Sequence, residues 1–401
     1  MKSKNAMLFI FITIVIDATG LGIIIPSLPY LVAETANVTV EQSSAYYGPV
    51  LVSYAVMQFI FAPIMGGLSD RYGRRPILLI SLLGLGIDYL FMFFAPTLMW
   101  LVIGRCIAGM FGASFTTASA YISDVSTPET RTKNFGLIGA GFGIGFVLGP
   151  AIGGFLAEFG LRTPFLAAAI LSLMNLIYGA LVLKESLPLE KRRAFSLKRS
   201  NPIGAFFRIG KYKEISMLFM VIFLYYLAGM AIHSSWNYIT EGKFDWTPKE
   251  VGISLAVVGI CIAIVQGTLT GRFAKAFGDR KTAKIGLIIF FFALLGIGFA
   301  SHGWMLYAMM LPYAFSGLSG PAIKAIMANN TRDDEQGELQ GTITSLISLA
   351  EIIGPLMMMG LFTYTTVNLP EEDKIFGSPY FAGAIFVVIA LVIFNKAMKK
   401  H

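Results

Sequence analysis

Two aspartates, Asp17 and Asp88, lie deep inside apolar runs that are long enough to cross a bilayer. At 1.5 Å per residue, Asp17 is about 16 Å from the start of its run and Asp88 about 18 Å from the start of its own. A carboxylate near the middle of a bilayer is costly unless it is paired, hydrated or protonated. Such a group can bind a proton in one state of a carrier and release it in another, so the two aspartates predict proton coupling. The alternative is a carboxylate that is hydrogen-bonded into a helix contact and takes no part in turnover.

Three further charged residues lie in apolar runs. Arg105 must face a partner or water, and we expect it to tune the protonation of the aspartates. The alternative is an arginine that snorkels toward the outer end of its helix. Lys324 and Glu351 lie in the second half of the chain, and each is costly alone. They either pair with each other or face the substrate, and Glu351 is also a candidate for proton coupling.

Other polar residues in the apolar runs are candidates for substrate contact. Together with Asp17, Lys324 and Glu351, the predicted substrate-binding set contains Gln58, Gln266, His233 and Asn237. His233 and Asn237 are one helical turn apart near the outer end of the seventh run, where amphipathic residues usually act as interfacial anchors.

The composition is that of a polytopic membrane protein. Of the 401 residues, 56% are hydrophobic and 13% are charged, and the mean hydropathy is +0.71, whereas a soluble domain carries about 25% charged residues. The net charge of +8 does not indicate a nucleic-acid binder, because the basic residues gather in alternate loops. Cys106 and Cys261 lie inside apolar runs and have no metal-binding or disulfide spacing.

Twelve apolar segments have a length that spans a bilayer. They cover about 6–30, 46–67, 77–96, 98–123, 135–158, 164–183, 215–239, 249–271, 282–300, 303–328, 339–364 and 378–396. The alternation of basic and non-basic loops predicts that both termini are cytoplasmic. The basic segment 184–214 is expected to be a cytoplasmic linker that is attracted to anionic lipid of the inner leaflet.

The two halves of the chain repeat at a constant offset of 205 residues. The matching positions are Gly66 and Gly271, Gly73 and Gly278, Arg75 and Arg280, Gly136 and Gly341, and the dipeptides Gly149-Pro150 and Gly354-Pro355. Such a repeat predicts two parallel six-helix bundles, here 1–183 and 215–401, with a substrate cavity between them near the midplane. The predicted fold is therefore an all-α integral membrane protein with twelve transmembrane helices.

A short charged hairpin, 66–76, joins the second and third segments and reads GGLSDRYGRRP. This string resembles the signature loop between helices 2 and 3 of the major facilitator superfamily. A generic basic turn would not need both glycines, the aspartate and the proline. The resemblance implies an inner gate made of Gly66, Asp70, Arg71, Gly73, Arg74 and Arg75, and Asp124 at the inner end of the fourth segment is expected to pair with the arginines.

The fifth segment is rich in glycine. Small residues let neighbouring helix backbones approach closely, and a proline permits a bend. The positions in question are Gly145, Gly149, Pro150, Gly153 and Gly154, and the simplest interpretation is helix packing. Their G-x-x-x-G-P-x-x-G-G string also resembles the motif that marks the exporters, or antiporters, of the superfamily, which implies outward transport.

The whole chain resembles the tetracycline-efflux branch of the twelve-helix drug/proton antiporters. Matching pieces are residues 16–22, 54–63, 87–90 and 335–341. The resemblance implies that Asp17 and Asp88 are the essential membrane aspartates of that branch, and that Arg105 is the arginine associated with proton coupling. Two positions depart from the pattern, because the ninth segment has no acid and the eighth has no histidine. Lys324 and Glu351 are additions to it, and a buried lysine suggests a partly anionic substrate.

The function expected from these residues is proton-coupled export of a small amphipathic compound or drug by alternating access. The alternatives are a proton symporter for an anionic or zwitterionic metabolite, and a non-transporting sensor or lipid flippase on the same scaffold. An enzyme is not expected, since the sequence shows no nucleophile–base set and no metal-ligand cluster. We expect a monomer in the inner membrane that contacts lipid, protons and a small-molecule substrate, without a cofactor, a metal or nucleic acid.

Overall fold

Every regular element that the structure describes is helical. The structure is a computed structural model, and it describes residues 3–112, 114–125, 128–192, 195, 215–330 and 336–399. The predicted linker 184–214 therefore lies largely outside the described residues.

Each of the twelve predicted segments is helical. In the first half the helices are α1 (Ser3–Ile24), α2 (Leu28–Ala36), α3 (Val40–Tyr72), α4 (Arg74–Phe94), α5 (Leu98–Phe111), α6 (Ser114–Val125), α7 (Pro128–Ala157) and α8 (Thr163–Val182). In the second half they are α9 (Ser216–Phe244), α10 (Pro248–Ile264), the π-helix η3 (Val265–Leu269), α11 (Thr270–Gly298), α12 (Gly303–Ser316), α13 (Ser319–Asn329), α14 (Gln336–Thr366) and α15 (Ser378–Met398). Short 3₁₀ turns follow at η1 (Leu189–Lys191) and η5 (Glu371–Asp373).

Several predicted spans are interrupted. Among the described residues, seven helical stretches are long and apolar enough to cross a membrane, or eight if the bent pair α1 and α2 is one span with its 48° bend. The fourth span is divided into α5 and α6 near Gly112, and the tenth into α12 and α13 near Gly317. These breaks leave each piece shorter than a bilayer-spanning helix, which takes about 20 residues. The all-α membrane fold thus contains helix breaks that hydrophobicity does not reveal.

The chain forms two compact units. The first contains Met1–Asn37, Ser53–Pro202 and Thr247–Ala256, and the second contains Val38–Val52, Ile203–Trp246 and Val257–His401. The start of α3 therefore belongs to the second unit and the start of α10 to the first. The bundle limits at 183 and 215 stay a prediction.

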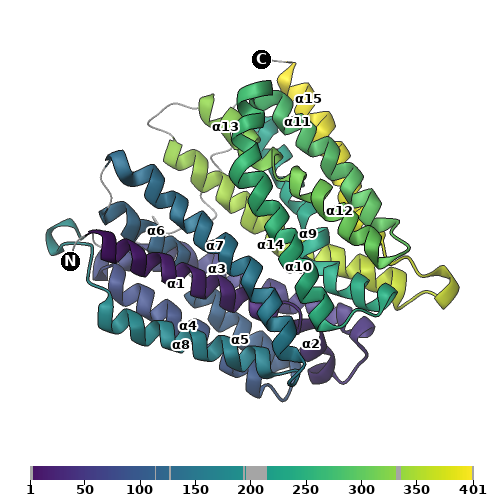
Figure 1. The fold of residues 1–401 in the computed structure, drawn as a ribbon, viewed down its shortest axis with the longest axis horizontal. Helices are drawn as coiled ribbons and strands as arrows, with labels where there is room; N and C mark the ends of the chain where they lie inside the picture. The colour runs from purple at the N-terminus through teal and green to yellow at the C-terminus, as the bar shows by residue number, and fades with distance from the viewer. Residues whose placement is uncertain are drawn as a thin grey trace. The chain divides into compact units, whose positions relative to one another are not determined.

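The internal repeat is present in the packing of each unit. In the first unit α1 packs on α7 and α8, and α4 packs on α8, α5 and α6 (Figure 1). In the second, α9 packs on α14 and α15, and α11 packs on α15, α12 and α13. The backbone repeats as well, because Gly73 and Gly278 both have a positive φ, of 105° and 75°. Glycine is the residue that adopts this conformation without a steric penalty.

The glycines of the fifth span let α7 lie against the backbone of α1. A Cβ added at Gly145 would lie 2.7 Å from the carbonyl oxygen of Val15, and one at Gly149 would lie 2.6 Å from that of Thr19. A Cβ at Gly153 would collide with the carbonyl oxygen of Ile23. Gly145, Gly149 and Gly153 therefore set the helix separation beside Asp17.

The first prediction tests this close approach. We expect Gly149→Val to lower the Tm of the detergent-solubilised protein by several degrees, because the side chain forces α1 away from α7. Gly143→Val in the same helix is the matched control, since a Cβ there meets nothing within 4 Å. Equal losses of Tm in the two variants would contradict the packing role of Gly149.

Candidate functional site

The centre of the first unit holds a buried ion pair between Asp88 on α4 and Arg105 on α5. Their exposed fractions are 0% and 4%. The Arg105 Nη2 is in direct contact with Asp88 Oδ2, and Nε donates to Asp88 Oδ1 at 3.3 Å. Arg105 thus binds a carboxylate in the helix core and does not snorkel to the outer surface. Gly104 permits the contact, because a Cβ there would lie 2.9 Å from Asp88 Oδ1.

Tyr54 of α3 contacts the guanidinium of Arg105, and Gln58 of α3 binds Tyr54. The Arg105 guanidinium lies over the Tyr54 ring, 5.3 Å from its centroid, in the geometry of a cation–π contact. Gln58 donates to the Tyr54 hydroxyl at 3.1 Å and to the carbonyl oxygen of Gly112 at 3.4 Å. Gln58 therefore connects the arginine's aromatic contact to the break between α5 and α6.

Asp17 lies in a separate polar cluster with α8. It is 5% exposed, and Asn175 donates to its Oδ1 at 3.4 Å. The Asn175 oxygen accepts a bond from Thr13 at 3.3 Å. Tyr89, the residue after Asp88, is buried, and its hydroxyl lies 3.3 Å from the Cβ position of Gly20, three residues after Asp17. A cation thus binds Asp88, while a neutral amide binds Asp17.

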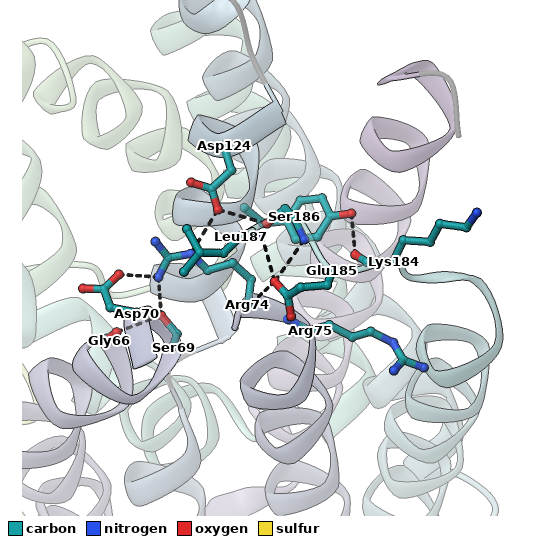
Figure 2. A network of polar contacts seen from close by, with 11 residues as sticks. Gly66, Ser69, Asp70, Arg74, Arg75, Asp124, Lys184, Glu185, Ser186 and Leu187 are labelled. Atoms are coloured by element: carbon teal, nitrogen blue, oxygen red, sulfur yellow. Dashed lines mark hydrogen bonds and ion pairs between the residues drawn. The ribbon is translucent and has the colours of Figure 1, made fainter. Parts of the chain in front are cut away.

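The loop between α3 and α4 forms an ion-pair network centred on Arg74 (Figure 2). The Arg74 Nη1 contacts Asp70 Oδ1 and Ser69 Oγ, both at 2.6 Å, and Nε contacts Asp124 Oδ2 at 3.1 Å. The expected pairing of Asp124 with an arginine of this loop is present, and Ser186 also donates to Asp124 at 2.9 Å.

Glu185, which follows α8, caps the N-terminus of α4 in the same network (Figure 2). Its carboxylate accepts the backbone N–H groups of Arg74 at 2.8 Å and Arg75 at 3.2 Å. The first N–H groups of a helix have no partner inside it, and a negative charge is favourable there. Gly73 makes this possible, because a Cβ would collide with the Glu185 carboxylate.

The other predicted gate residues are less enclosed. Arg71 is exposed and lies over the ring of Tyr72. Arg75 donates to the carbonyl oxygen of Ala180 at 2.8 Å. Gly66 has open space around it, so packing does not require a glycine there.

In the second unit, Lys324 and Glu351 do not pair. The Lys324 ammonium donates to the hydroxyl of Tyr226 at 3.1 Å. Within the described ranges, the structure records neither an ion pair nor a hydrogen bond for Glu351, which is half-buried on α14. Of the two arrangements that the sequence left open, the direct Lys324–Glu351 pair is the one this structure lacks.

The remaining candidates lie on different elements of the second unit. Gln266 lies in the π-helix η3, and its amide nitrogen would be 2.6 Å from a Cβ at Gly317, beside the break between α12 and α13. On α9, His233 is exposed whereas Asn237 is buried. The structure does not bring these residues into one cluster with Lys324.

Sequence reasoning missed three residues that complete these clusters: Asn175, Glu185 and Tyr226. Asn175 is a single amide in an apolar run, which is a visible but weak signal. Nothing in the sequence marked Glu185 or Tyr226, because their partners Arg74 and Lys324 lie about a hundred residues away.

Comparison with known proteins identifies a family and several relatives. The family model described as the Major Facilitator Superfamily matches residues 10–239 and 218–399. The class C tetracycline resistance protein of Escherichia coli is 40% identical over 90% of this chain and 91% of its own length. The class H tetracycline resistance protein of Pasteurella multocida is 37% identical over 90% of each chain.

Solved structures are similar in fold. The nucleoside transporter NupG has a TM-score of 0.79 at 14% identity and covers all of both chains. The human organic anion transporter MFSD10 has a TM-score of 0.73 at 21% identity, covering 98% of this chain and all of its own.

The second prediction concerns the buried ion pair. Asp88→Asn should cost about 3–5 kcal/mol of stability, because the Arg105 charge is left without its carboxylate. The double variant Asp88→Asn with Arg105→Gln should lose less than Asp88→Asn alone, since neither charge remains. Heat unfolding in detergent measures both.

The control for this pair is Lys249→Gln, which removes an exposed ion pair with Glu158 that is worth about 1 kcal/mol or less. A double variant as unstable as the sum of its two single variants would disprove coupling between Asp88 and Arg105.

The third prediction concerns the helix cap. Gly73→Ala and Glu185→Ala should each cost about 1 kcal/mol of stability. The double variant should lose less stability than the sum of the two, because both changes remove the same contact, the Glu185 cap of α4. Gly66→Ala should leave the Tm unchanged, since its Cβ has open space. Additive losses would show that Gly73 and Glu185 act independently.

Proposed function

The chain belongs to the major facilitator superfamily, a family of transporters, and from this premise we propose that it exports tetracyclines or related amphipathic drugs in exchange for protons. The tetracycline resistance proteins that it resembles support an exporter over a symporter, a sensor or a flippase. The eighth and ninth spans lack the histidine and the acid expected of tetracycline exporters. We therefore assign proton coupling to the charged residues of the first unit, Asp17, Asp88 and Arg105.

The observation that carries the proposal is the buried set of Asp17, Asp88 and Arg105 in the first unit. Arg105 holds Asp88 in a direct ion pair, which offsets the cost of a charged carboxylate in a membrane span. Asp17 accepts a hydrogen bond from the neutral amide of Asn175. In this proposal Asp17 carries the coupled proton, and Asp88 with Arg105 forms a charged anchor between α4 and α5.

A proton on Asp17 changes the charge that its surroundings must accommodate. The glycines of α7 hold α1 at close range there, so a change in the hydration of Asp17 acts directly on the contact between these helices. Tyr89 follows Asp88 on α4, and its hydroxyl lies 3.3 Å from the Cβ position of Gly20 on α1, so it packs the helix of Asp88 against the helix of Asp17. Proton binding is thereby coupled to helix packing.

The Arg74 network serves as the inner gate in this proposal. An ion pair joins Arg74 to Asp124 at the end of α6, and hydrogen bonds join the start of α4 and Asp124 to Glu185 and Ser186, which follow α8. Because Asp70 is 47% exposed, the Arg74–Asp70 pair can break at modest cost, whereas the Glu185 cap holds the start of α4. The network can therefore open at one contact and remain anchored at another.

The other assignments complete the proposal. Glu351 is a second proton-binding candidate, and Gln58, Gln266, His233 and Asn237 remain candidates for substrate contact. We place the protein in the inner membrane as a monomer with both termini cytoplasmic, and the proton is its coupling ion.

The fourth prediction tests the proton carrier. Asp17→Asn in proteoliposomes should abolish the internal pH change that tetracycline addition causes in the wild type, because an amide cannot bind and release the coupled proton. A pH-sensitive dye inside the vesicles reports the change, and its direction distinguishes antiport from symport.

The matched control is Asp245→Asn. Asp245 ends α9 in the left-handed conformation, which asparagine tolerates, so its flux should equal that of the wild type. Coupled flux that persists in Asp17→Asn would exclude Asp17 as the carrier. A wild type that moves no protons with tetracycline would exclude the proposed exchange.

A further inference from the structure

Lys324 is a charged residue that points into the membrane span. It lies five residues before the end of α13 at Asn329, which is about 7–8 Å along the helix. Its ammonium donates to the hydroxyl of Tyr226 at 3.1 Å. Tyr226 lies ten residues into α9, about 15 Å from that helix's start. The expected topology puts the start of α9 and the end of α13 on the cytoplasmic side, and the contact with Tyr226 then directs the lysine away from the nearer interface.

The acid that could neutralise Lys324 is not bound to it. Within the residues that the structure describes, Lys324 has no carboxylate at ion-pair distance, and Glu351 makes no hydrogen bond. A lysine that points inward without a counter-ion is expensive in a bilayer. Such residues usually mark substrate or ion pathways in membrane proteins.

The Lys324–Tyr226 cluster is rich in donors and poor in acceptors. An ammonium has three N–H donors, and one of them is directed at the Tyr226 oxygen. The phenol accepts that bond and keeps its own O–H to donate. Among the described residues, two ammonium donors and one hydroxyl donor therefore have no recorded acceptor. An anionic oxygen would satisfy them with charge-assisted hydrogen bonds.

The tyrosine is held in place by its neighbours. The Tyr226 ring packs against the edge of Tyr225 at 5.3 Å, and Tyr225 packs against Phe290 at 5.5 Å. The Tyr225 hydroxyl donates to the carbonyl oxygen of Ser316 at 3.2 Å, next to the break between α12 and α13. The cluster is thus built on fixed aromatic contacts, while Lys324 and Tyr226 are only half-buried and accessible.

We propose that Lys324 and Tyr226 bind an anionic oxygen, a carboxylate or an enolate, of the transported compound. The substrate class is then an amphipathic molecule with an acidic group. This inference deepens the proposed export function and rests on it for the statement that the ligand is transported. A lipid phosphate presents the same chemistry and is separated in the experiment below.

The test is equilibrium binding of 2-naphthoate and 2-naphthamide to the purified full chain in phosphatidylcholine nanodiscs. The two probes share one ring system, and only naphthoate carries a charge. The wild type should bind naphthoate about tenfold more tightly, the factor that one strong charge-assisted bond supplies. Lys324→Gln should remove this preference, Tyr226→Phe should reduce it, and Lys324→Arg should retain it.

The matched control is Lys284→Gln, which removes an exposed basic residue of the same unit and should leave the preference unchanged. An equal preference in the wild type and Lys324→Gln would overturn the proposal, as would no preference in the wild type. Loss of naphthoate binding when phosphatidylglycerol is added would assign the site to lipid and overturn it too.

The outcome is separate from that of the export experiment, because binding needs no pH gradient. If naphthoate preference depends on Lys324 but the protein shows no proton-coupled flux, the anion site is supported and the proposed export function is rejected. If the protein shows coupled flux but no naphthoate preference, the export function is supported and the anion site is rejected.

Discussion

Lipid tails offer no partner to a charged side chain, so the protein itself must supply one. In this protein Asp88 and Arg105 partner each other. Gly104 leaves room for the carboxylate, and Tyr54 covers the guanidinium. Replacing a buried pair by apolar residues is often harmless, but removing one partner is not. The pair therefore fixes the contact of α4 with α5.

Among the described residues, the two halves share a backbone turn but not a charge network. Gly73 and Gly278 have the same unusual conformation, yet a Cβ at Gly278 would meet nothing within 4 Å while one at Gly73 would strike Glu185. The positions 205 residues after Asp70 and Arg74 are Lys275 and Asp279, which reverses their charges. In the part of the chain that the structure describes, the ion-pair network that suits a gate is recorded in the first unit, whereas the turn itself is present in both.

The helix breaks also lie at corresponding positions in the two halves. Gly112 and Gly317 are 205 residues apart, and each follows the first piece of a divided span. A glutamine amide lies beside each of them, from Gln58 and from Gln266. A break frees backbone carbonyls that lipid cannot satisfy, so an amide donor nearby lowers its cost. Discontinuous spans in corresponding positions are also the usual pointer to a binding region in transporters of this kind.

The sequence alone determined the membrane-spanning segments, the 205-residue repeat, the loop motif and the acids in apolar runs, because hydrophobicity and residue spacing are local properties. Only the tertiary structure decided which charges meet. Arg105 binds Asp88, which is 17 residues away in the sequence. Glu185 caps a helix that begins 111 residues earlier. Lys324 donates to Tyr226 and does not pair with Glu351. The physical reason is that a buried charge is stabilised by groups a few ångströms away in space. Helix packing sets the position of those groups, and local sequence patterns do not show which distant residues it brings together.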